Sequence, residues 1–413
     1  MFYRLELDAE SSAYVGVTAV PKPGAKVGFG DGFEVSVQDA DGATCGSGQA
    51  RIGSSQSPRP LTAWAQRQVG PNENRCAGAG TYYVVVQRER SPVSGATIAR
   101  GSWDLELSVA SEPGLKGAGN EPTEAPDTWD SASPVPAAGE RRVRAGGAGF
   151  DAATGLEAGV WGDRIVAGET LFYRVPVDWG QRISATAELG SKGSGRDFDY
   201  VTSALSLSLY NPVRGQVAEA DTAYDGKQKS ASLDPLPPVA YENRYSPRDA
   251  VTGMRFAGWY YLAVQLNPAV RAKFGKEPLD LTLRVDVKGV RKKGPAYAGA
   301  ARPSGVFAVT GRDKAAARSG ATRAGAAAES GDTTMKVVAA GGIGTGVVLL
   351  VVLGMWTLVG RRRARGMAAA AAVGTGAEGG GWAAGGGSGG GGGSGGRGVQ
   401  VPPSGGGGAP SGW

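Results

Sequence analysis

The stretch FYRLEL at residues 2–7 governs the interpretation of the whole chain, because it returns as FYRVPV at residues 172–177. In its first occurrence the apolar residues Tyr3, Leu5 and Leu7 alternate with residues that point the other way. This period of two is typical of a half-buried β-strand. The chain therefore contains the same strand twice, and the residues that follow each copy decide whether a whole domain is repeated.

Four further blocks follow each copy in the same order. They pair AYVGVTA from residue 13 with RISATA from residue 182, FEVSVQDADG from 33 with LSLSLYNPVRG from 205, GTYYVVVQRE from 80 with GWYYLAVQLN from 258, and WDLELSV from 103 with LDLTLRV from 279. Five ordered blocks at nearly constant spacing indicate an internal duplication. Within each copy, short alternating strands are separated by Gly, Pro, Asn and Asp turns. We therefore predict an all-β protein with two tandem β-sandwich or jelly-roll domains.

Two strands give more detail about position in the sheet. YYVVV at residues 82–86 and YYLAV at residues 260–264 are apolar on both faces, which favours central strands covered on two sides. Pro176 lies inside an otherwise regular strand and cannot donate a backbone hydrogen bond. It therefore predicts an edge position or a bulge there.

The second copy has a lead-in that the first lacks. Residues 149–170 precede the second FYR and contain a predicted strand at 160–166. We therefore expect that about two dozen residues of the first domain, and a secretion signal before them, precede the sequence given. The alternative is that the first domain tolerates the loss and that the membrane span described below acts as its own signal anchor.

Composition limits the chemistry. The chain has no histidine, which excludes Ser-His and Cys-His nucleophile pairs and the usual zinc and haem ligands. Two cysteines cannot form a four-thiolate zinc site or an iron–sulfur cluster. A net charge of +6 over 413 residues gives no argument for nucleic acid. We expect no metal, no cofactor and no catalytic residues.

Cys45 and Cys76 both lie in the first copy, one after a strand and one just before the next central strand. Strands on either side of one excursion can be neighbours, so we predict a disulfide worth about 3 kcal/mol. The alternative is two unpaired buried thiols. A disulfide indicates an oxidising, extracellular setting.

Residues 337–360, VVAAGGIGTGVVLLVVLGMWTLVG, are uncharged and largely apolar. As a helix this stretch spans roughly 36 Å, enough for a hydrocarbon core of about 30 Å. We predict a single transmembrane helix, in preference to a buried helix of a soluble domain. Gly342 and Gly346 form a G-x-x-x-G motif with Gly354 on nearly the same face, an arrangement that permits close packing of two helices and a homodimer.

An arginine cluster follows the span: Arg361, Arg362, Arg363 and Arg365. The positive-inside rule makes this a stop-transfer signal in the cytoplasm, which places the N-terminus outside and the protein at the cell membrane. The remaining segments are predicted from composition. The predicted organisation is a first sandwich at 1–111, a Pro/Ala/Gly-rich linker at 112–146, a second sandwich at 147–290, an Ala/Gly/Arg-rich stalk at 291–336, the span at 337–360, and a disordered Gly-rich cytoplasmic tail at 361–413.

Several short motifs have both a chemical and a structural interpretation. DADG at residues 39–42 resembles the start of a calcium loop but lacks the later ligands, so we interpret it as a turn. Asp197 and Asp199 could pair as acid and base, or simply face solvent. GFGDGF at residues 28–33 has no following helix or lysine for phosphate binding and is interpreted as a turn. The tryptophans that we consider for core packing or for sugar stacking are Trp64, Trp161, Trp179 and Trp259.

The run GETLFYRVPVDWGQRISATAEL, the strand LSLSLYN, and the strands GWYYLAVQL and LDLTLRVDV together resemble the bacterial pre-peptidase C-terminal domain family. The resemblance covers each copy but not the stalk, span or tail. It implies a non-catalytic β-sandwich that is accessory to secreted proteins. The whole arrangement is also similar to membrane-anchored surface proteins of high-GC Gram-positive bacteria, although the von Willebrand A module that some of them carry is not visible here.

Our first hypothesis is a single-pass cell-surface protein whose two sandwiches bind a protein or polysaccharide of the envelope. A second is a surface hydrolase that uses two carboxylates about 5 to 9.5 Å apart in a cleft. A third is a signal-transmitting anchor whose cytoplasmic tail engages a partner.

Overall fold

The computed structural model describes residues 1–22, 25–53, 57–70, 76–89, 101–117, 124–126, 128–192 and 199–323. The chain divides into two units, Met1–Lys336 and Val337–Trp413. The predicted span with Gly342, Gly346 and Gly354, and the arginine cluster after it, lie outside the described residues. Among the helices of the described part, none has the length and apolar character needed to cross a bilayer.

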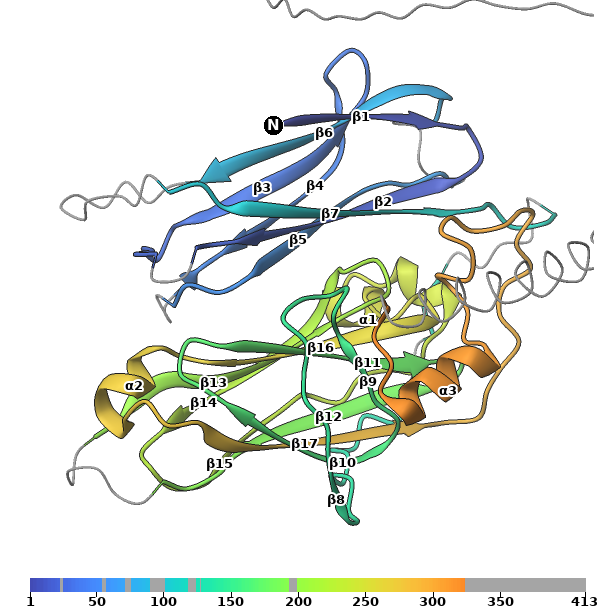
Figure 1. Ribbon diagram of the computed structural model, residues 1–413. Coiled ribbons are helices and arrows are strands. Elements are labelled where there is room, and N and C mark those ends of the chain that lie inside the picture. The colour runs from blue at the N-terminus through green and yellow to red at the C-terminus, as the bar shows by residue number, and fades with distance from the viewer. Residues whose placement is uncertain are drawn as a thin grey trace, which may run out of the picture. The chain divides into compact units, whose positions relative to one another are not determined.

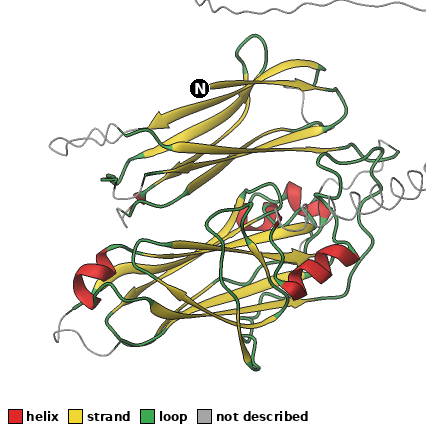
Figure 2. Cartoon of the chain, in the orientation of Figure 1, coloured by secondary structure: helices red, strands yellow, loops and turns green. Residues whose placement is uncertain are grey.

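β-Strands dominate the described residues, and the helices are short (Figures 1 and 2). The strands fall into two groups, which we name sandwich 1 and sandwich 2. Sandwich 1 consists of β1 (Phe2–Leu7), β2 (Ser12–Val20), β3 (Gly32–Gln38), β4 (Thr44–Arg51), β5 (Leu61–Arg67), β6 (Gly80–Glu89) and β7 (Asp104–Glu112). Its two sheets have the strand orders β1-β6-β3-β4 and β5-β2-β7.

Sandwich 2 has the same plan with additional strands. Its strands are β8 (Arg141–Val143), β9 (Thr154–Gly155), β10 (Gly159–Ile165), β11 (Thr170–Val177), β12 (Arg182–Leu189), β13 (Val201–Tyr210), β14 (Gln216–Tyr224), β15 (Lys229–Ser232), β16 (Gly258–Leu266) and β17 (Leu279–Lys288). Its helices are η2 (Tyr241–Tyr245), α1 (Asp249–Thr252), α2 (Ala269–Phe274) and α3 (Gly311–Ser319). The sheet orders are β9-β11-β16-β13-β14 and β15-β12-β17-β10-β8.

The two sandwiches match strand for strand. Reading the orders together, β1, β6, β3 and β4 correspond to β11, β16, β13 and β14, while β5, β2 and β7 correspond to β15, β12 and β17. The register also agrees. Arg4 lies opposite Tyr83 in the first sandwich, and the matching residues Arg174 and Tyr261 lie opposite each other in the second. The expected duplication is therefore present in the strand order and in the pairing.

The second block was aligned with AYVGVTA starting at residue 13 and RISATA starting at residue 182. The structure shows that this alignment is wrong by one residue at its start. Val17 lies opposite Leu107, and Ala187 lies opposite Leu283, which matches Leu107. Val17 therefore corresponds to Ala187, so the block in sandwich 2 begins one residue later than the sequence comparison placed it. The structure decides this because a one-residue slip would turn every side chain to the opposite face.

The predicted strand positions agree with the structure in part. The tyrosine-pair strands, β6 and β16, are each flanked on both sides within their sheets. Both faces of β16 are buried, whereas Tyr83 on the outer face of β6 is 37% exposed. Pro176 lies on β11 beyond the two residues, Tyr173 and Arg174, that pair with β9, so its missing N–H leaves no partner unsatisfied there.

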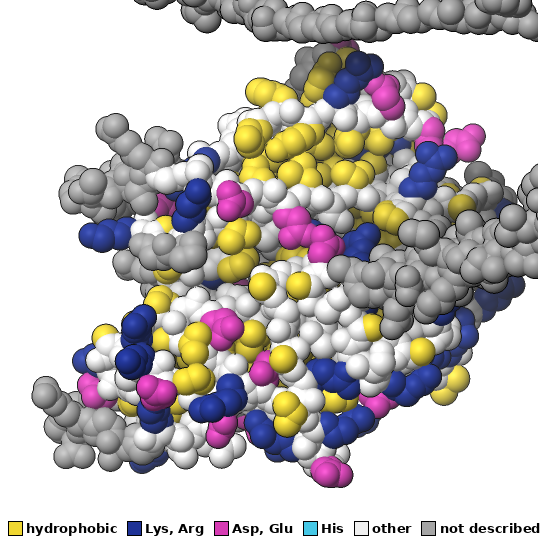
Figure 3. Space-filling model, in the orientation of Figure 1, with side chains coloured by type: hydrophobic (Ala, Val, Ile, Leu, Met, Phe, Trp, Pro, Cys, Tyr) yellow, Lys and Arg dark blue, Asp and Glu magenta, His cyan; other side chains and the backbone are white. Residues whose placement is uncertain are grey.

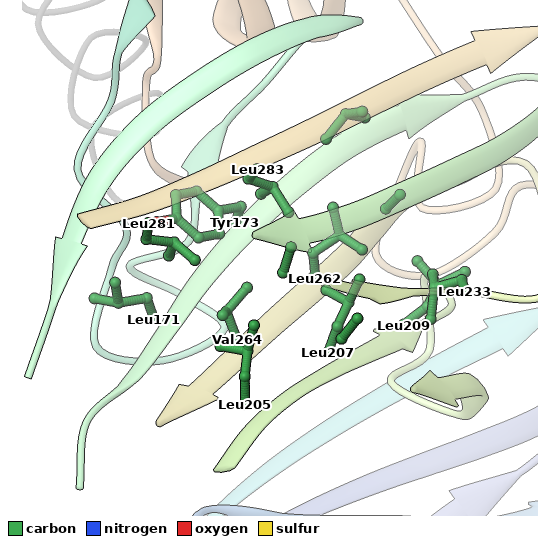
Figure 4. Packing of buried hydrophobic residues seen from close by; sticks show 14 of the residues in the cluster. Leu171, Tyr173, Leu205, Leu207, Leu209, Leu233, Leu262, Val264, Leu281 and Leu283 are labelled. Carbon is green, nitrogen blue, oxygen red and sulfur yellow. The ribbon is translucent and has the colours of Figure 1, made fainter. Parts of the chain in front are cut away.

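Each sandwich has its own core. The core of sandwich 2 contains Leu171 and Tyr173 from one sheet and Leu281 and Leu283 from the other, and these side chains point toward one another (Figure 4). Val15, Val35 and Val84 belong to the smaller core of sandwich 1. Burial of these alternating side chains supplies the main driving force for folding, at about 25 cal/mol per Å² of apolar surface.

The predicted disulfide is present. Cys45 near the start of β4 is bonded to Cys76, and their Cα atoms are 5.7 Å apart. Cys76 has a positive φ of 62°, a conformation uncommon for a residue with a side chain, and the bridge holds it at the entry to β6.

The structure differs from the expected linker and stalk where it describes them. Within 112–146, Glu112 is the last residue of β7, and β8 adds to the edge of sandwich 2. Within 291–336, Phe307 and Val309 are buried, and α3 packs against β9 and β11. A capping box between Thr310 and Asp313 starts α3, a signal that the Ala/Gly/Arg-rich composition of this segment obscured.

Replacing both cysteines with serine is expected to lower the free energy of unfolding by about 3 kcal/mol, since the bridge closes a loop across a sequence separation of 31. Urea denaturation of the full chain, followed by tryptophan fluorescence, measures the change. A reducing agent should bring the wild-type midpoint down to that of the variant. An unchanged midpoint after complete reduction would contradict the assigned role.

Candidate functional site

A cavity of about 1270 Å³ lies beside sandwich 1, where β1 and β7 are the edge strands of the two sheets. Its apolar wall includes Leu5, Leu7 and Val109. Its far wall includes Glu112, Arg244 and the segment 298–303. We name this the β1–β7 cavity. It is the candidate functional site because it combines apolar side chains with convergent polar groups.

Glu112 anchors the end of the β1–β7 cavity at which the two sandwiches meet. Only 2% of its surface is exposed, and its carboxylate accepts four hydrogen bonds. Arg244 of η2 donates two of them, at 2.7 and 3.2 Å. The hydroxyls of Tyr14 and Tyr297 donate the other two, each at 2.7 Å. These four residues, which we name the Glu112 joint, connect β2 and β7 of sandwich 1 to segments that follow β15 and β17.

The electrostatics of the Glu112 joint favour the ionised carboxylate. Burial alone would raise the pKa of Glu112, but the Arg244 guanidinium and the hydroxyls of Tyr14 and Tyr297 hold the pKa below its ordinary value. Burial also raises the pKa of Tyr14, and the neighbouring Glu112 charge adds to this effect, so the hydroxyl remains a donor. A buried ion pair is stable only when its remaining lone pairs are satisfied in this way.

An aromatic layer extends from the Glu112 joint. The centroid of the Tyr14 ring lies 5.9 Å from the ring centroid of Trp64 and 5.0 Å from that of Phe256. The fully buried guanidinium of Arg255 lies 5.0 to 5.3 Å from the centroids of these three rings and donates to the side-chain amide oxygen (Oε1) of Gln66. Residues of both sandwiches therefore share one buried layer, which makes the two sandwiches a single structural body. We name this body the head.

A second ion pair joins β7 to sandwich 2. The guanidinium of Arg214 lies 2.7 Å from Glu106 and 3.2 Å from Asp151, and 3% of its side chain is exposed. Close backbone approach accompanies it, because a Cβ atom on Gly16 would lie 2.7 Å from the Val213 carbonyl oxygen. Glycine at this position lets β2 approach the 211–215 turn directly.

Arg67 shapes the opposite rim of the β1–β7 cavity. Its fully buried guanidinium donates to the carbonyl oxygens of Asp8 and Ser11 at 2.6 Å, and to that of Cys76 at 2.8 Å. The arginine thereby ties the β1–β2 turn to the disulfide-bonded loop. The carboxylate of Asp8 accepts from the backbone of Ser11 in the same turn.

A second cavity, of about 970 Å³, lies on sandwich 2. It is lined by Trp129, Trp179 and Tyr241, and by the cations Arg182, Lys288, Lys292 and Lys293. We name it the basic cavity. Two of its cations are paired, Arg182 with Asp130 at 2.7 Å and Lys288 with Asp286 at 3.1 Å.

The residues singled out in the sequence have mainly structural positions. Asp39 makes the predicted turn, since its carboxylate accepts from the backbone N–H groups of Asp41 and Ala43. Asp199 pairs with Lys273 at 3.3 Å, while Asp197 lies outside the described residues. In the 28–33 turn, the Asp31 carboxylate accepts from the Gly28 N–H at 2.8 Å.

The four tryptophans considered for sugar stacking are engaged within the protein. Trp161 and Trp179 are buried. Trp64 belongs to the aromatic layer, and Trp259 donates to Asp313 of α3 at 2.8 Å beneath the Arg174 guanidinium. The sugar-stacking interpretation therefore loses the support of these residues.

Sequence reasoning missed Glu112, Arg244 and Tyr297 of the joint between the sandwiches, and Arg255 of the adjoining aromatic layer. Glu112 and Arg244 are 132 positions apart, and charged residues are seldom fully buried, so neither stands out locally. The signal that could have been used is the alternation of β7. It places Glu112 on the face of Glu106 and Ala110, opposite to the face of Leu105 and Leu107 that packs against the core of sandwich 1, so the partners of this carboxylate come from outside that core.

Comparisons with known proteins give little. No family model matches the chain, and no curated protein matches it. Among solved structures, the tandem CBM22-1-CBM22-2 domain of Xyn10C from Paenibacillus barcinonensis is 11% identical, covering 70% of this chain and 82% of that one with a TM-score of 0.18. The ANX1 ectodomain from Arabidopsis thaliana is 10% identical, covering 71% and 83% with a TM-score of 0.17. At these scores the likenesses carry no argument.

Glu112→Gln is expected to lower the free energy of unfolding of the full chain by about 3 kcal/mol, because it leaves the Arg244 guanidinium buried without a counter-charge. Glu89→Gln is the matched control. It breaks an ion pair with Arg51 in which that arginine's side chain is 51% exposed, and we expect no measurable change. Equal effects of the two substitutions in urea denaturation would contradict the role of the joint.

The Glu112 joint also predicts a pH dependence. Because the pKa of Glu112 is lowered in the folded state, its stabilisation is complete above the ordinary carboxyl value of 4.5 and is lost as the pH falls below it. Denaturation midpoints at pH 7 and pH 3 should therefore differ more for the wild type than for Glu112→Gln. An equal change of the denaturation midpoint between pH 7 and pH 3 in the two proteins would contradict the role assigned to Glu112.

Proposed function

We propose that this protein is a membrane-anchored cell-surface protein whose head binds another protein of the envelope without catalysing a reaction. The observation that carries the proposal is the β1–β7 cavity, whose apolar wall of Leu5, Leu7 and Val109 is open to a partner. Apolar side chains that converge on one cavity are typical of a binding site.

The Glu112 joint supports a binding role. A partner that docks between two mobile domains must first order them, whereas a head with a buried joint has already met that entropic cost. The Cys45–Cys76 bond is consistent with an oxidising, extracellular position of the head. The apolar stretch 337–360 and the arginine cluster supply the anchor and orientation in this proposal.

The carboxylates of the β1–β7 cavity favour binding over hydrolysis. Hydrogen bonds from Arg4 and Thr81 lower the pKa of Glu6. Burial would raise the pKa of Asp8, but the backbone N–H groups of Ser11 and Glu10 lower it overall. A glycosidase-type general acid requires the opposite shift, toward neutrality. The resemblance to the pre-peptidase C-terminal family, which implies a non-catalytic β-sandwich, also favours binding over hydrolysis.

The basic cavity supports a second candidate, an anionic wall polymer. Lys292 and Lys293 are exposed on its rim, and no acidic partner of either is found in the described part of the chain. The half-buried Trp129 offers an apolar surface beside them. Cations around an aromatic ring suit a phosphate-bearing or carboxylate-bearing polymer.

Protein binding is tested on intact cells with a photo-crosslinking residue in place of Val109. Val290 is the control position, since 83% of its side chain is exposed and it lies away from the β1–β7 cavity. We expect a discrete adduct from position 109, absent from position 290. Protease added to the same cells should remove the head and spare the carboxyl end. Adducts from both positions, or a head that survives while the carboxyl end is cut, would contradict the proposal.

The second candidate is tested with synthetic poly(glycerol phosphate). Lys292→Glu with Lys293→Glu should lower affinity at least tenfold in a salt-dependent manner, whereas Lys276→Glu with Lys227→Glu should not, since those residues do not line the basic cavity. Equal binding by both double variants would remove this candidate.

A further inference from the structure

The basic cavity of sandwich 2 lies at the position that the Glu112 joint occupies in sandwich 1. In sandwich 1, Ser12 of β2 lies opposite Glu112 of β7. The matching residues of β12 and β17 are Arg182 and Lys288, which also lie opposite each other and line the basic cavity. The same position of the repeated fold is therefore acidic in one sandwich and basic in the other.

In both sandwiches this position holds a segment from elsewhere in the chain. Glu112 holds Arg244 of η2. The Arg182 guanidinium donates to the Asp130 carboxylate at 2.7 Å and to the Asp130 carbonyl oxygen. The side chains of Glu112 and Arg244 are 2% and 9% exposed, whereas those of Asp130 and Arg182 are 66% and 24% exposed. Because an exposed ion pair stabilises little, the second contact is open to exchange with another anion.

Asp130 belongs to the segment 128–140, which leads into β8 and which we name the strap. No residue from 128 to 143 is buried. The half-buried Trp129 lines the basic cavity, and the Ala137 carbonyl oxygen accepts a hydrogen bond from Arg284 at 2.9 Å. Segments with few buried apolar contacts open at a low cost in free energy. The strap can therefore leave the cavity while sandwich 2 stays folded.

The loops that carry the cations are held together without the strap. The Lys292 N–H donates to the Trp179 carbonyl oxygen at 2.8 Å. A Cβ atom on Gly180 would lie 2.6 Å from the Val290 carbonyl oxygen, and one on Gly294 would lie 2.5 Å from the Trp179 indole nitrogen. This close approach fixes the two loops against each other. The cavity is thus preorganised for a ligand, which lowers the cost of binding.

Charge is distributed unequally between the strap and the cavity. Lys and Arg side chains gather on sandwich 2 in Figure 3, on the side where β17 ends in Figure 1. The hydrogen bond from Arg182 lowers the pKa of Asp130, so the carboxylate stays ionised at neutral pH. The linker sequence 117–140 contains no Lys or Arg and carries the carboxylates of Glu121, Glu124, Asp127, Asp130 and Glu140. An anionic ligand therefore meets a cation that an acidic segment already engages.

We infer that the basic cavity binds a phosphate-bearing polymer in competition with the strap, which acts as an internal ligand. One phosphate group of the polymer takes the place of the Asp130 carboxylate on Arg182, and Lys292 and Lys293 contact the groups beside it. A polymer that presents several phosphates displaces the strap, whereas a single phosphate does so poorly. This inference rests on the second candidate function and adds its regulation.

Two substitutions break the Arg182–Asp130 pair from opposite sides, and their effects are measured by titrating synthetic poly(glycerol phosphate) into the full chain in detergent. Asp130→Asn frees the cavity and should raise the affinity about fivefold. Arg182→Gln also frees the strap but removes the cation that holds the polymer, and should lower the affinity about tenfold. Changes of affinity in the same direction would overturn the inference.

Asp280→Asn is the matched control for charge. Asp280 lies at the other end of β17, its side chain is 74% exposed, and it pairs with Arg164 at 3.8 Å. It removes the same charge from the head as Asp130→Asn, and we expect it to change the affinity by less than about twofold. In the Arg182→Gln background, Asp130→Asn should have little further effect. Equal rises in affinity for positions 130 and 280 would assign the effect to net charge and contradict competition.

Displacement of the strap is observed directly by fluorine NMR of the full chain labelled with fluorotryptophan. The resonance of Trp129 is assigned by its loss in Trp129→Phe. We expect saturating poly(glycerol phosphate) to move this resonance to its position in the isolated peptide of residues 124–134, EAPDTWDSASP. A resonance that stays unchanged at saturation would show that polymer and strap bind together, and the inference would be wrong.

The same titrations separate this inference from the second candidate function. If binding depends on Lys292 and Lys293 while Asp130→Asn leaves the affinity unchanged, the second candidate stands and competition is wrong. If neither the wild type nor Asp130→Asn binds the polymer, both fall. Binding by Asp130→Asn with none by the wild type would support competition in its strongest form.

Discussion

The shared pairing register of the two sandwiches is the constraint on which the rest of the structure depends. Because side chains alternate along a strand, fixing Arg4 opposite Tyr83 and Arg174 opposite Tyr261 sends equivalent residues of β1 and β11 into equivalent interiors. In sandwich 2 that interior is closed by β10. In sandwich 1 the same register directs the apolar side chains of Leu5 and Leu7 toward the β1–β7 cavity.

The Glu112 joint gives this opening a fixed wall. Glu112 ends β7, whose Val109 and Ser111 also line the cavity, and its carboxylate holds Arg244 of η2 and Tyr297 of the segment after β17. The position of the far wall therefore depends on a buried charge and not on a flexible linker. Truncating one partner of such a pair is costly, because the remaining charge stays buried.

The strands, the duplication and the disulfide could be predicted from the sequence because each depends on local alternation or on two rare residues. The Glu112 joint could not, since its members are scattered between Tyr14 and Tyr297 and only tertiary packing brings them together. Composition misled for the segment after residue 290, where Phe307 and Val309 are buried despite Ala/Gly/Arg-rich surroundings. The membrane span and its glycines remain predictions.

The central claim is that, among the residues that the structure describes, β10 and β12 flank β17 in sandwich 2, whereas the matching stretch of β7, residues 104–109, is paired with β2 alone. Residue-resolved hydrogen exchange of the unliganded full chain tests it most directly. We expect alternate amides of 105–109 on β7 to exchange quickly, since only β2 pairs with them, and the amides of 281–285 on β17 to be protected throughout by β10 and β12. Uniform protection of 105–109 would show that this edge is already paired and would contradict the account.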